Sequence, residues 1–144
     1  NIHYIDEDGN AKHPVIIHSA IPGGIERYLY ILFDNFEQGL PLWLNPVHIR
    51  LISVGGEFVE KCQALVRELS DLPLRIEIDD RSISVSSKLK RAHQDFVPHK
   101  VVIGQQEIDD GCKELKKLAK NLAKEMSGKP FIRREWVVEI SRQL

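Results

Sequence analysis

Two short stretches of the 144-residue chain combine side chains that could bind phosphate or nucleic acid. The first runs from His18 to Arg27 and places Pro22, Gly23 and Gly24 between an apolar run and a helix-like pattern. Glycines let a nucleotide approach the backbone closely, amides at a helix start suit phosphate, and Arg27 adds a bidentate cation. The pattern is compatible with a phosphate-binding turn, but the residues alone favour an ordinary turn beside an exposed arginine.

The second stretch is an acidic and basic loop followed by a basic helix. Carboxylates can accept hydrogen bonds from guanine or cytosine amino groups, while cations hold the backbone of single-stranded RNA. The residues alone favour a solvated helix face over such an RNA contact. The loop contains Asp79, Asp80, Arg81 and Ser82, and the cations that follow are Lys88, Lys90, Arg91 and Lys100.

Composition limits the classes of protein to which the chain can belong. Lys and Arg number 20 against 21 Asp and Glu, so an anionic partner must meet a local patch rather than a polycation. Hydrophobic residues make up 42% of the chain, enough for a core, and no run approaches the roughly 18 apolar residues of a membrane span. Cys62 and Cys112 form no CxxC motif, which disfavours a disulfide framework and indicates a reducing cytosol.

Hydrophobic spacing predicts the elements that position these residues. A hairpin is expected from strands at 2–5 and 14–18 around a turn at Asp8 and Gly9, followed by a helix at 25–36. Further strands are predicted near 47–54, 74–79 and 99–103, with helices at about 58–69, 86–95 and 111–126 and a short strand or helix at 136–140. This alternation predicts an α/β domain with a small, mixed, largely parallel sheet.

A proline-bounded connector at 40–46 divides the chain into expected domains 1–40 and 45–144. The first residues already have the pattern of a hairpin strand, and no charged segment followed by an apolar run precedes them. We therefore expect no signal peptide, and we expect the chain to be a piece of a longer protein.

Longer motifs give the chain a family resemblance. The runs 14–21, 23–28 and 41–47 resemble the end of the catalytic domain of threonyl-tRNA synthetases, including motif 3, where it enters the anticodon-binding domain. The runs 78–81, 88–90, 97–98 and 104–107 resemble the core signature of class II anticodon-binding domains. The resemblance covers about residues 4–109 and implies a three-layer α/β anticodon-binding domain, preceded by a hairpin and a helix of the catalytic domain.

The resemblance implies roles for the first stretch. Arg27 holds the place of the motif 3 arginine, a catalytic residue that contacts the ATP phosphates, and Gly24 lies beside it. His18 holds the place of a ligand of the catalytic zinc, whose cysteine and second histidine precede this segment in the family. Because a zinc site needs about three protein ligands, we expect no zinc on this chain alone. Ser19 and Gly24 depart from the arginine and serine that the family often has there.

For RNA, the resemblance implies that Ser82, Lys90 and Glu107 contact anticodon bases, although Lys90 replaces a usual arginine. After Glu107 the family continues with a short strand that bears a base-reading arginine, whereas here residues 109–112 lead directly into a helix. Lysine and arginine side chains nearby are expected to meet phosphate. The expected tRNA-binding residues are Arg81, Ser82, Lys88, Lys90, Arg91 and Glu107.

The implied function is that of the C-terminal part of a cytoplasmic, homodimeric threonine–tRNA ligase, which activates threonine with ATP and joins it to tRNA(Thr). This segment would bind the anticodon stem-loop and supply motif 3, and it would be inactive alone, with neither ATP nor zinc bound. The departures at Ser19 and Gly24 leave open a non-catalytic tRNA-binding or editing companion with a degenerate synthetase domain. A generic α/β ligand-binding domain without an RNA partner is the third alternative.

Overall fold

The computed structural model describes residues 2–21, 23–36, 39–131 and 138–140. The chain divides into two compact units, residues 1–37 and 38–144, each with its own structure. This division lies a few residues before the connector at 40–46. None of the helices in the described ranges is long and apolar enough to cross a membrane.

The first unit begins with a small hairpin. Strands β1 (Tyr4–Ile5) and β2 (Ala11–Lys12) pair antiparallel, with Tyr4 opposite Lys12. Asp6 closes the loop, because its Oδ1 accepts hydrogen bonds from the backbone N–H groups of Asp8 at 3.0 Å and Asn10 at 2.8 Å. A short aspartate side chain thus fixes the turn that the sequence predicted.

The expectation of a second strand at 14–18 is wrong. Residues 13–21 form no strand, and β2 ends at Lys12. Pro14 has no N–H to donate to a strand ladder, and this two-stranded ribbon offers no further strand that could extend the pairing.

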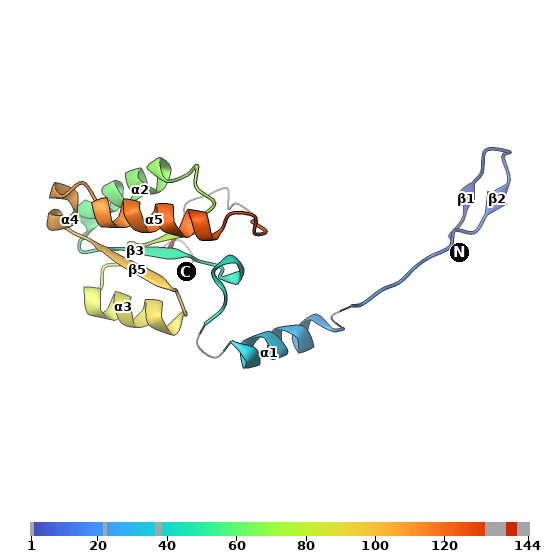
Figure 1. The fold of residues 1–144 in the computed structure, drawn as a ribbon, viewed down its shortest axis with the longest axis horizontal. Helices are drawn as coiled ribbons and strands as arrows, with labels where there is room; N and C mark the ends of the chain where they lie inside the picture. The colour runs from blue at the N-terminus through green and yellow to red at the C-terminus, as the bar shows by residue number, and fades with distance from the viewer. Residues whose placement is uncertain (1, 22, 37–38, 132–137, 141–144) are drawn as a thin grey trace. The chain divides into compact units, whose positions relative to one another are not determined.

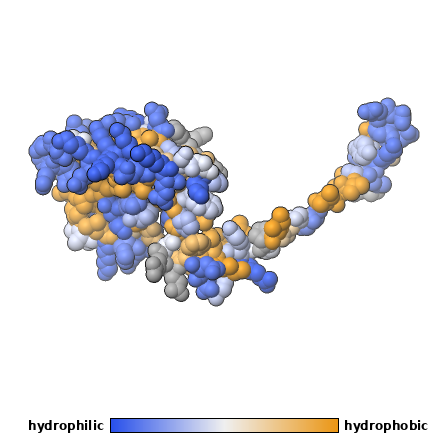
Figure 2. All heavy atoms as spheres, in the orientation of Figure 1, coloured by the Kyte–Doolittle hydropathy of each residue, from blue (hydrophilic) through white to orange (hydrophobic). Residues whose placement is uncertain are grey.

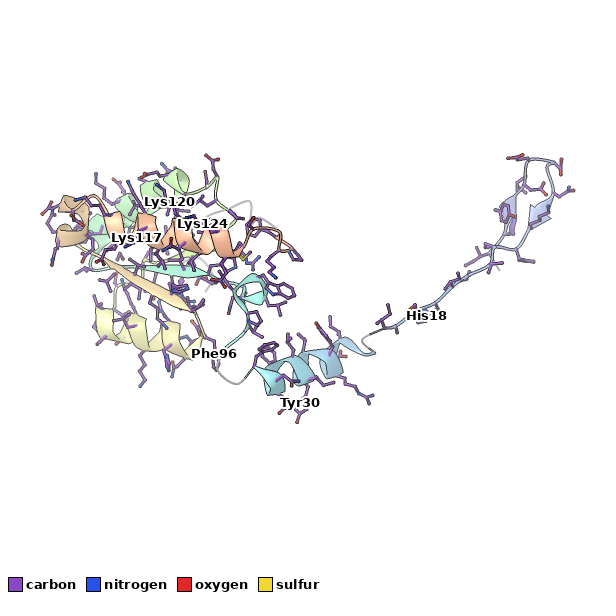
Figure 3. The ribbon with its side chains drawn as sticks, viewed as in Figure 1. His18, Tyr30, Phe96, Lys117, Lys120 and Lys124 are labelled. Atoms are coloured by element: carbon purple, nitrogen blue, oxygen red, sulfur yellow. The ribbon has the colours of Figure 1, made fainter. Side chains whose placement is uncertain are left out.

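Helix α1 (Ile25–Asn35) confirms the helical spacing in the first unit. The carbonyl of Gly24 accepts the N–H of Tyr28 at 3.1 Å, and Gly23 just before it has a left-handed φ of 76° that favours glycine. No residue of α1 is buried, although the helix is amphipathic. Its exposed apolar side chains include Ile25, Tyr28, Leu29, Tyr30, Ile31 and Phe33 (Tyr30 is labelled in Figure 3).

The second unit is built on a four-stranded sheet with the strand order β5–β3–β4–β6, in which every described pair is parallel. The strands are β3 (Ile49–Ser53), β4 (Ile76–Asp79), β5 (His99–Ile103) and β6 (Val138–Glu139). Ile52 pairs with Asp79, and Ser53 pairs with Ile103, so the carboxyl ends of three strands meet at one edge.

Helices cover both faces of this sheet, which confirms the three-layer expectation. Helices α2 (Val59–Glu68) and α5 (Lys113–Glu125) lie on one face and α3 (Val85–Gln94) on the other (Figure 1). Short helical segments η1 (Leu42–Leu44), η2 (Gly56–Phe58) and α4 (Gln105–Asp109) complete the unit, and α4 was not predicted.

The core lies between the sheet and the α2 and α5 layer. Its members are fully or almost fully buried, and each stabilises the fold by about 1.5–3 kcal/mol through burial of its large apolar side chain. They include Ile49, Leu51, Ile78 and Ile103 from the strands, with Leu65, Leu115 and Leu122 from the helices. Cys62 is also buried and free, and burial raises the pKa of its thiol to about 11.

Candidate nucleic-acid interface

The carboxyl ends of β3, β4 and β5 carry three neighbouring loops. The N–H of Val54, after β3, donates to the carbonyl of Ile103 at 3.0 Å, which ties the first loop to the end of β5. Gly104, which follows β5, packs so closely against Val54 that a Cβ at this position would lie 3.1 Å from the Val54 Cγ2. The chain leaves β3 and β4 toward opposite faces, and this is the point at which open α/β sheets bind ligands.

Lys88 lies beneath this edge instead of on the surface. Its side chain reaches inward from α3, and the residue is 1% exposed. The ammonium donates to the Ser53 carbonyl at 2.7 Å, the Ser53 Oγ at 3.2 Å and the Asp79 carbonyl at 3.2 Å. These oxygens match the three donors of a lysine. The expectation that Lys88 meets phosphate therefore does not fit its place, because its ammonium holds the ends of β3 and β4 together.

Arg81 is oriented by a buried carboxylate. Asp79 is fully buried and accepts from the Arg81 Nε at 2.9 Å and from its Nη2 at 2.6 Å. Burial alone would raise the pKa of Asp79, but the hydrogen bonds and charge of Arg81, with the charge of Lys88, outweigh it and lower that pKa. The Arg81 side chain remains 20% exposed at the edge, and its guanidinium keeps donors that Asp79 does not use.

Ser82 is exposed beside Arg81, at the loop that begins α3. Ser84 caps the helix by accepting the N–H of Ser87 at 3.3 Å. Lys90 and Arg91 are exposed farther along α3, at about 1.5 Å per residue, so Lys90 lies roughly 9 Å from the cap. The Nε of Arg91 lies 3.3 Å from a carboxylate oxygen of Asp95. The structure thus brings Arg81 and Ser82 to the edge and leaves Lys90 and Arg91 on the outer surface of the helix.

Glu107 lies at the same edge, after β5. Its Oε2 accepts the N–H of Gly104 at 3.0 Å and so caps the start of α4. Because β3 separates β4 from β5, the loops that carry Ser82 and Glu107 begin about two strand spacings, or roughly 10 Å, apart. The half-buried carboxylate can cap the helix with one oxygen and present the other to a ligand.

Lys100 lies outside this edge group. It is half-buried on β5, and its Nζ donates to the Val97 carbonyl at 2.9 Å. The carbonyl belongs to the loop before β5, at the opposite end of the strand from Gly104.

The residues expected to serve the catalytic centre lie in the first unit. Arg27 is exposed in the first turn of α1, and Gly24 immediately precedes that helix. His18 is exposed, and no group of three potential metal ligands occurs among the described residues (Figure 3). Because a zinc site needs about three protein ligands, His18 could serve as one only beside ligands from elsewhere.

One residue with a positioning role, Ser53, was missed by the sequence analysis. Its carbonyl accepts a hydrogen bond from the Lys88 ammonium, and its Oγ donates to the Asp79 carbonyl at 3.1 Å. A signal was present, because Lys88 lies at helical spacing between Val85 and Ala92, on the face of α3 that turns toward the sheet. A lysine at an inward position predicts a buried polar partner at the end of a strand.

Comparison with known proteins shows to which family the chain is similar. The model of the anticodon binding domain family matches residues 48–133. A threonine–tRNA ligase of Staphylothermus marinus is 39% identical over 116 residues, which are 75% of this chain and 19% of that protein. A threonine–tRNA ligase of Pyrobaculum calidifontis is 33% identical over 141 residues, covering 92% of this chain and 23% of that protein. The chain thus spans about a fifth of the length of these curated relatives.

A solved structure agrees with the sequence comparisons. The RNA binding domain of threonyl-tRNA synthetase from Cryptosporidium parvum superposes with a TM-score of 0.55 at 28% identity, over 76% of this chain and 28% of that one. The resemblance of this chain to threonyl-tRNA synthetases is therefore confirmed.

Proposed function

We propose that this chain, which belongs to the family of anticodon-binding domains, binds the anticodon arm of a threonine tRNA. The observation that carries the proposal is the meeting of Arg81, Ser82 and Glu107 at the carboxyl edge of the parallel sheet. This edge lies within the residues that the family model matches. It presents a hydroxyl, a carboxylate and an oriented guanidinium to one ligand.

These groups suit unpaired bases. A splayed-out base exposes its Watson–Crick edge, which side chains can read by hydrogen bonds. Glu107 can accept from an exocyclic amino group, while the Ser82 hydroxyl can donate or accept. The Asp79 pair holds the Arg81 guanidinium before the RNA arrives, so less side-chain entropy is lost on binding. Lys90 and Arg91, on the outer side of α3, are proposed to hold flanking nucleotides.

A binding titration with a threonine tRNA and an anticodon-swapped copy tests this proposal. Ser82→Ala and Glu107→Gln should each reduce discrimination between the two RNAs by about 1–3 kcal/mol, on the scale of one lost base contact. Glutamine keeps an oxygen for the Gly104 N–H, so the cap on α4 is preserved. Ser70→Ala and Glu125→Gln, at exposed positions away from the edge, are matched controls. Equal loss for both RNAs, or no loss, would contradict base reading.

For the whole protein we propose threonine–tRNA ligase activity in a cytoplasmic homodimer, with this chain alone inactive. The free amides of the first turn of α1, with Arg27 beside Gly24, suit ATP phosphates. ATP would supply the adenylyl group that activates threonine. His18 would be one zinc ligand among others from outside this chain. Arg27→Ala in the whole enzyme should raise the barrier to adenylate formation by about 2–4 kcal/mol, and an unchanged rate would contradict the role.

The second candidate, a non-catalytic tRNA-binding or editing companion, rests on the departures at Ser19 and Gly24. The same adenylate assay on the unmodified whole protein separates the two. Formation of threonyl-adenylate favours the ligase, and tRNA binding without it favours the companion.

A further inference from the structure

Helix α5 carries a row of lysines on the side opposite its buried face. Leu115, Ala119 and Leu122 pack into the core, and the lysines lie on the far side of the helix at spacings of three and four residues. The row consists of Lys113, Lys116, Lys117, Lys120 and Lys124. Figure 2 shows a largely hydrophilic surface over the α2 and α5 layer.

Among the described residues, carboxylates balance only part of this charge. Lys113 pairs with Asp110 at 2.9 Å, and Lys116 pairs with Glu68 at 2.7 Å. Lys117, Lys120 and Lys124 are exposed, and among the described residues no carboxylate lies within ion-pair distance of them (Figure 3). Like charges at these spacings repel one another and destabilise a helix. An anion held across the row would relieve that repulsion.

The surface between these side chains is hollowed. The five lysines line one hollow of about 540 Å³ together with Leu72, Asn121 and Ala123. None of the described residues that line it is acidic. Ammonium groups on long side chains around a shallow hollow act as point charges without fixed geometry, which suits phosphate groups rather than base edges.

The row is continuous with the candidate interface. Helix α5 begins just after α4, at the carboxyl edge of the sheet where Glu107 lies, and runs back along the sheet. Its 13 residues span about 20 Å at 1.5 Å per residue. An RNA whose loop meets the edge can therefore place its stem along the lysines. The chain as a whole has a net charge of −1, so this attraction is local.

We infer that the lysine row on α5 is a second RNA contact, which holds the phosphate backbone of the stem next to the anticodon loop. The inference rests on the proposed function for the identity of the RNA. The contact is independent of base sequence, in contrast to the loop edge.

The test is a salt titration of tRNA binding by the full 144-residue chain. The variant replaces Lys117, Lys120 and Lys124 with glutamine, and a second variant replaces them with arginine. Each lysine contact accounts for about 0.7–0.9 of the slope of log affinity against log salt, so the glutamine variant should lose roughly 2–3 from that slope. Between about 50 and 200 mM salt, its affinity should fall roughly 20- to 40-fold less than that of the unmodified chain. The arginine variant should behave like the unmodified chain.

The outcomes separate this inference from the proposed function. The glutamine variant should weaken threonine tRNA and its anticodon-swapped copy equally, and it should also weaken an unrelated RNA hairpin. If the glutamine variant weakens all three RNAs while the unmodified chain does not discriminate between the two tRNAs, the result supports the α5 contact and contradicts anticodon reading. If the glutamine variant keeps the salt slope of the unmodified chain and still discriminates between the two tRNAs, the α5 contact is overturned and anticodon reading is not. Circular dichroism of both variants should match the unmodified chain, because the substituted side chains are exposed.

Discussion

Helices α1 and α5 have the same kind of amphipathic sequence and different surroundings. In the second unit, α5 buries Leu115, Ala119 and Leu122 against a sheet from its own unit. In the first unit, α1 buries no residue, and Tyr30 and Phe33 are largely exposed. Apolar spacing therefore predicts that a segment is helical, but it does not say whether the chain supplies the surface that the helix covers. The second unit carries its own partner surfaces, and the described residues of the first do not.

The largest expected effect comes from separating the units. Residues 38–144 alone should unfold cooperatively on heating, because the four-stranded sheet, the helices that cover it and the core all lie within that range. Residues 1–37 alone should show little helix, since an isolated helix of 11 residues is marginal in water. Far-ultraviolet circular dichroism and thermal unfolding of both pieces measure this. A stable, helical first piece would break the comparison.

The next largest effect is expected at Lys88. Lys88→Met should reduce the free energy of unfolding by about 2–4 kcal/mol, because it removes the buried ammonium that donates to the Ser53 and Asp79 carbonyls. Lys90→Met, two residues away on the exposed side of the same helix, is the matched control and should change stability by less than about 0.5 kcal/mol. Urea denaturation of both variants gives the difference. Equal effects would show that the buried ammonium does not hold the strand ends together.

Lys88 and Lys90 also show which features of the structure can be predicted from the sequence. Alternating apolar runs and turn residues were enough to predict β3, β4, β5 and the helices between them, since burial sets their period. The sequence analysis did not predict that the site residues gather at the carboxyl edge, which is seen only in the registers of the paired strands. Charge alone did not separate Lys88 from Lys90, because a long side chain can bury its ammonium wherever strand-end oxygens are offered. The cap on α4 is a local contact between Glu107 and Gly104, in a helix of 5 residues that is too short to show a periodic pattern. The missing strand at 14–18 depended on a proline.

A smaller effect, dependent on pH, is expected from His48 in the second unit. His48 is buried, and burial with the nearby charge of Arg75 lowers its pKa to about 4, from its ordinary 6.5. Its Nδ1 accepts the Arg75 N–H at 3.1 Å, so protonation would break that bond. Below pH 6.5, His48 therefore binds a proton in the unfolded state, whereas in the folded state it binds one only near pH 4.

Stability should consequently fall by about 2 kcal/mol between pH 7 and pH 5 through this residue alone. Urea denaturation of the unmodified chain at the two pH values measures the loss, and His48→Asn should have a flatter dependence. The lowered pKa of Asp79 acts only at more acidic pH, below its ordinary 3.8. Burial also lowers the pKa of His99, which adds a loss in the same direction, so the difference between the variant and the unmodified chain isolates the contribution of His48. An identical pH dependence in the variant would assign the loss to other groups.

The smallest effect is expected at Phe96, where the second unit resembles the first in exposing an aromatic side chain. Phe96 follows α3 with a left-handed φ of 53° and is 73% exposed. The Phe96 N–H donates to the His93 carbonyl at 3.0 Å, and the Val97 N–H donates to the Ala92 carbonyl at 3.1 Å. This pattern is the Schellman motif, in which glycine normally occupies the position that Phe96 holds.

Phe96→Gly should therefore raise the free energy of unfolding by about 0.5–1 kcal/mol, since relief of roughly 1–2 kcal/mol of left-handed strain exceeds the added entropy of an unfolded glycine. Phe96→Ala keeps the Cβ and the strain, so it should not stabilise the unit. Thermal unfolding of the three proteins, compared at equal concentration, measures the differences. If glycine destabilises the unit instead, packing of the Phe96 ring outweighs the strain. Phe96 then stabilises its own unit, as the buried side chains of α5 do. If glycine stabilises it, the exposed aromatic ring is free of any role in folding and is available, like the outer face of α1, to a surface outside its own unit.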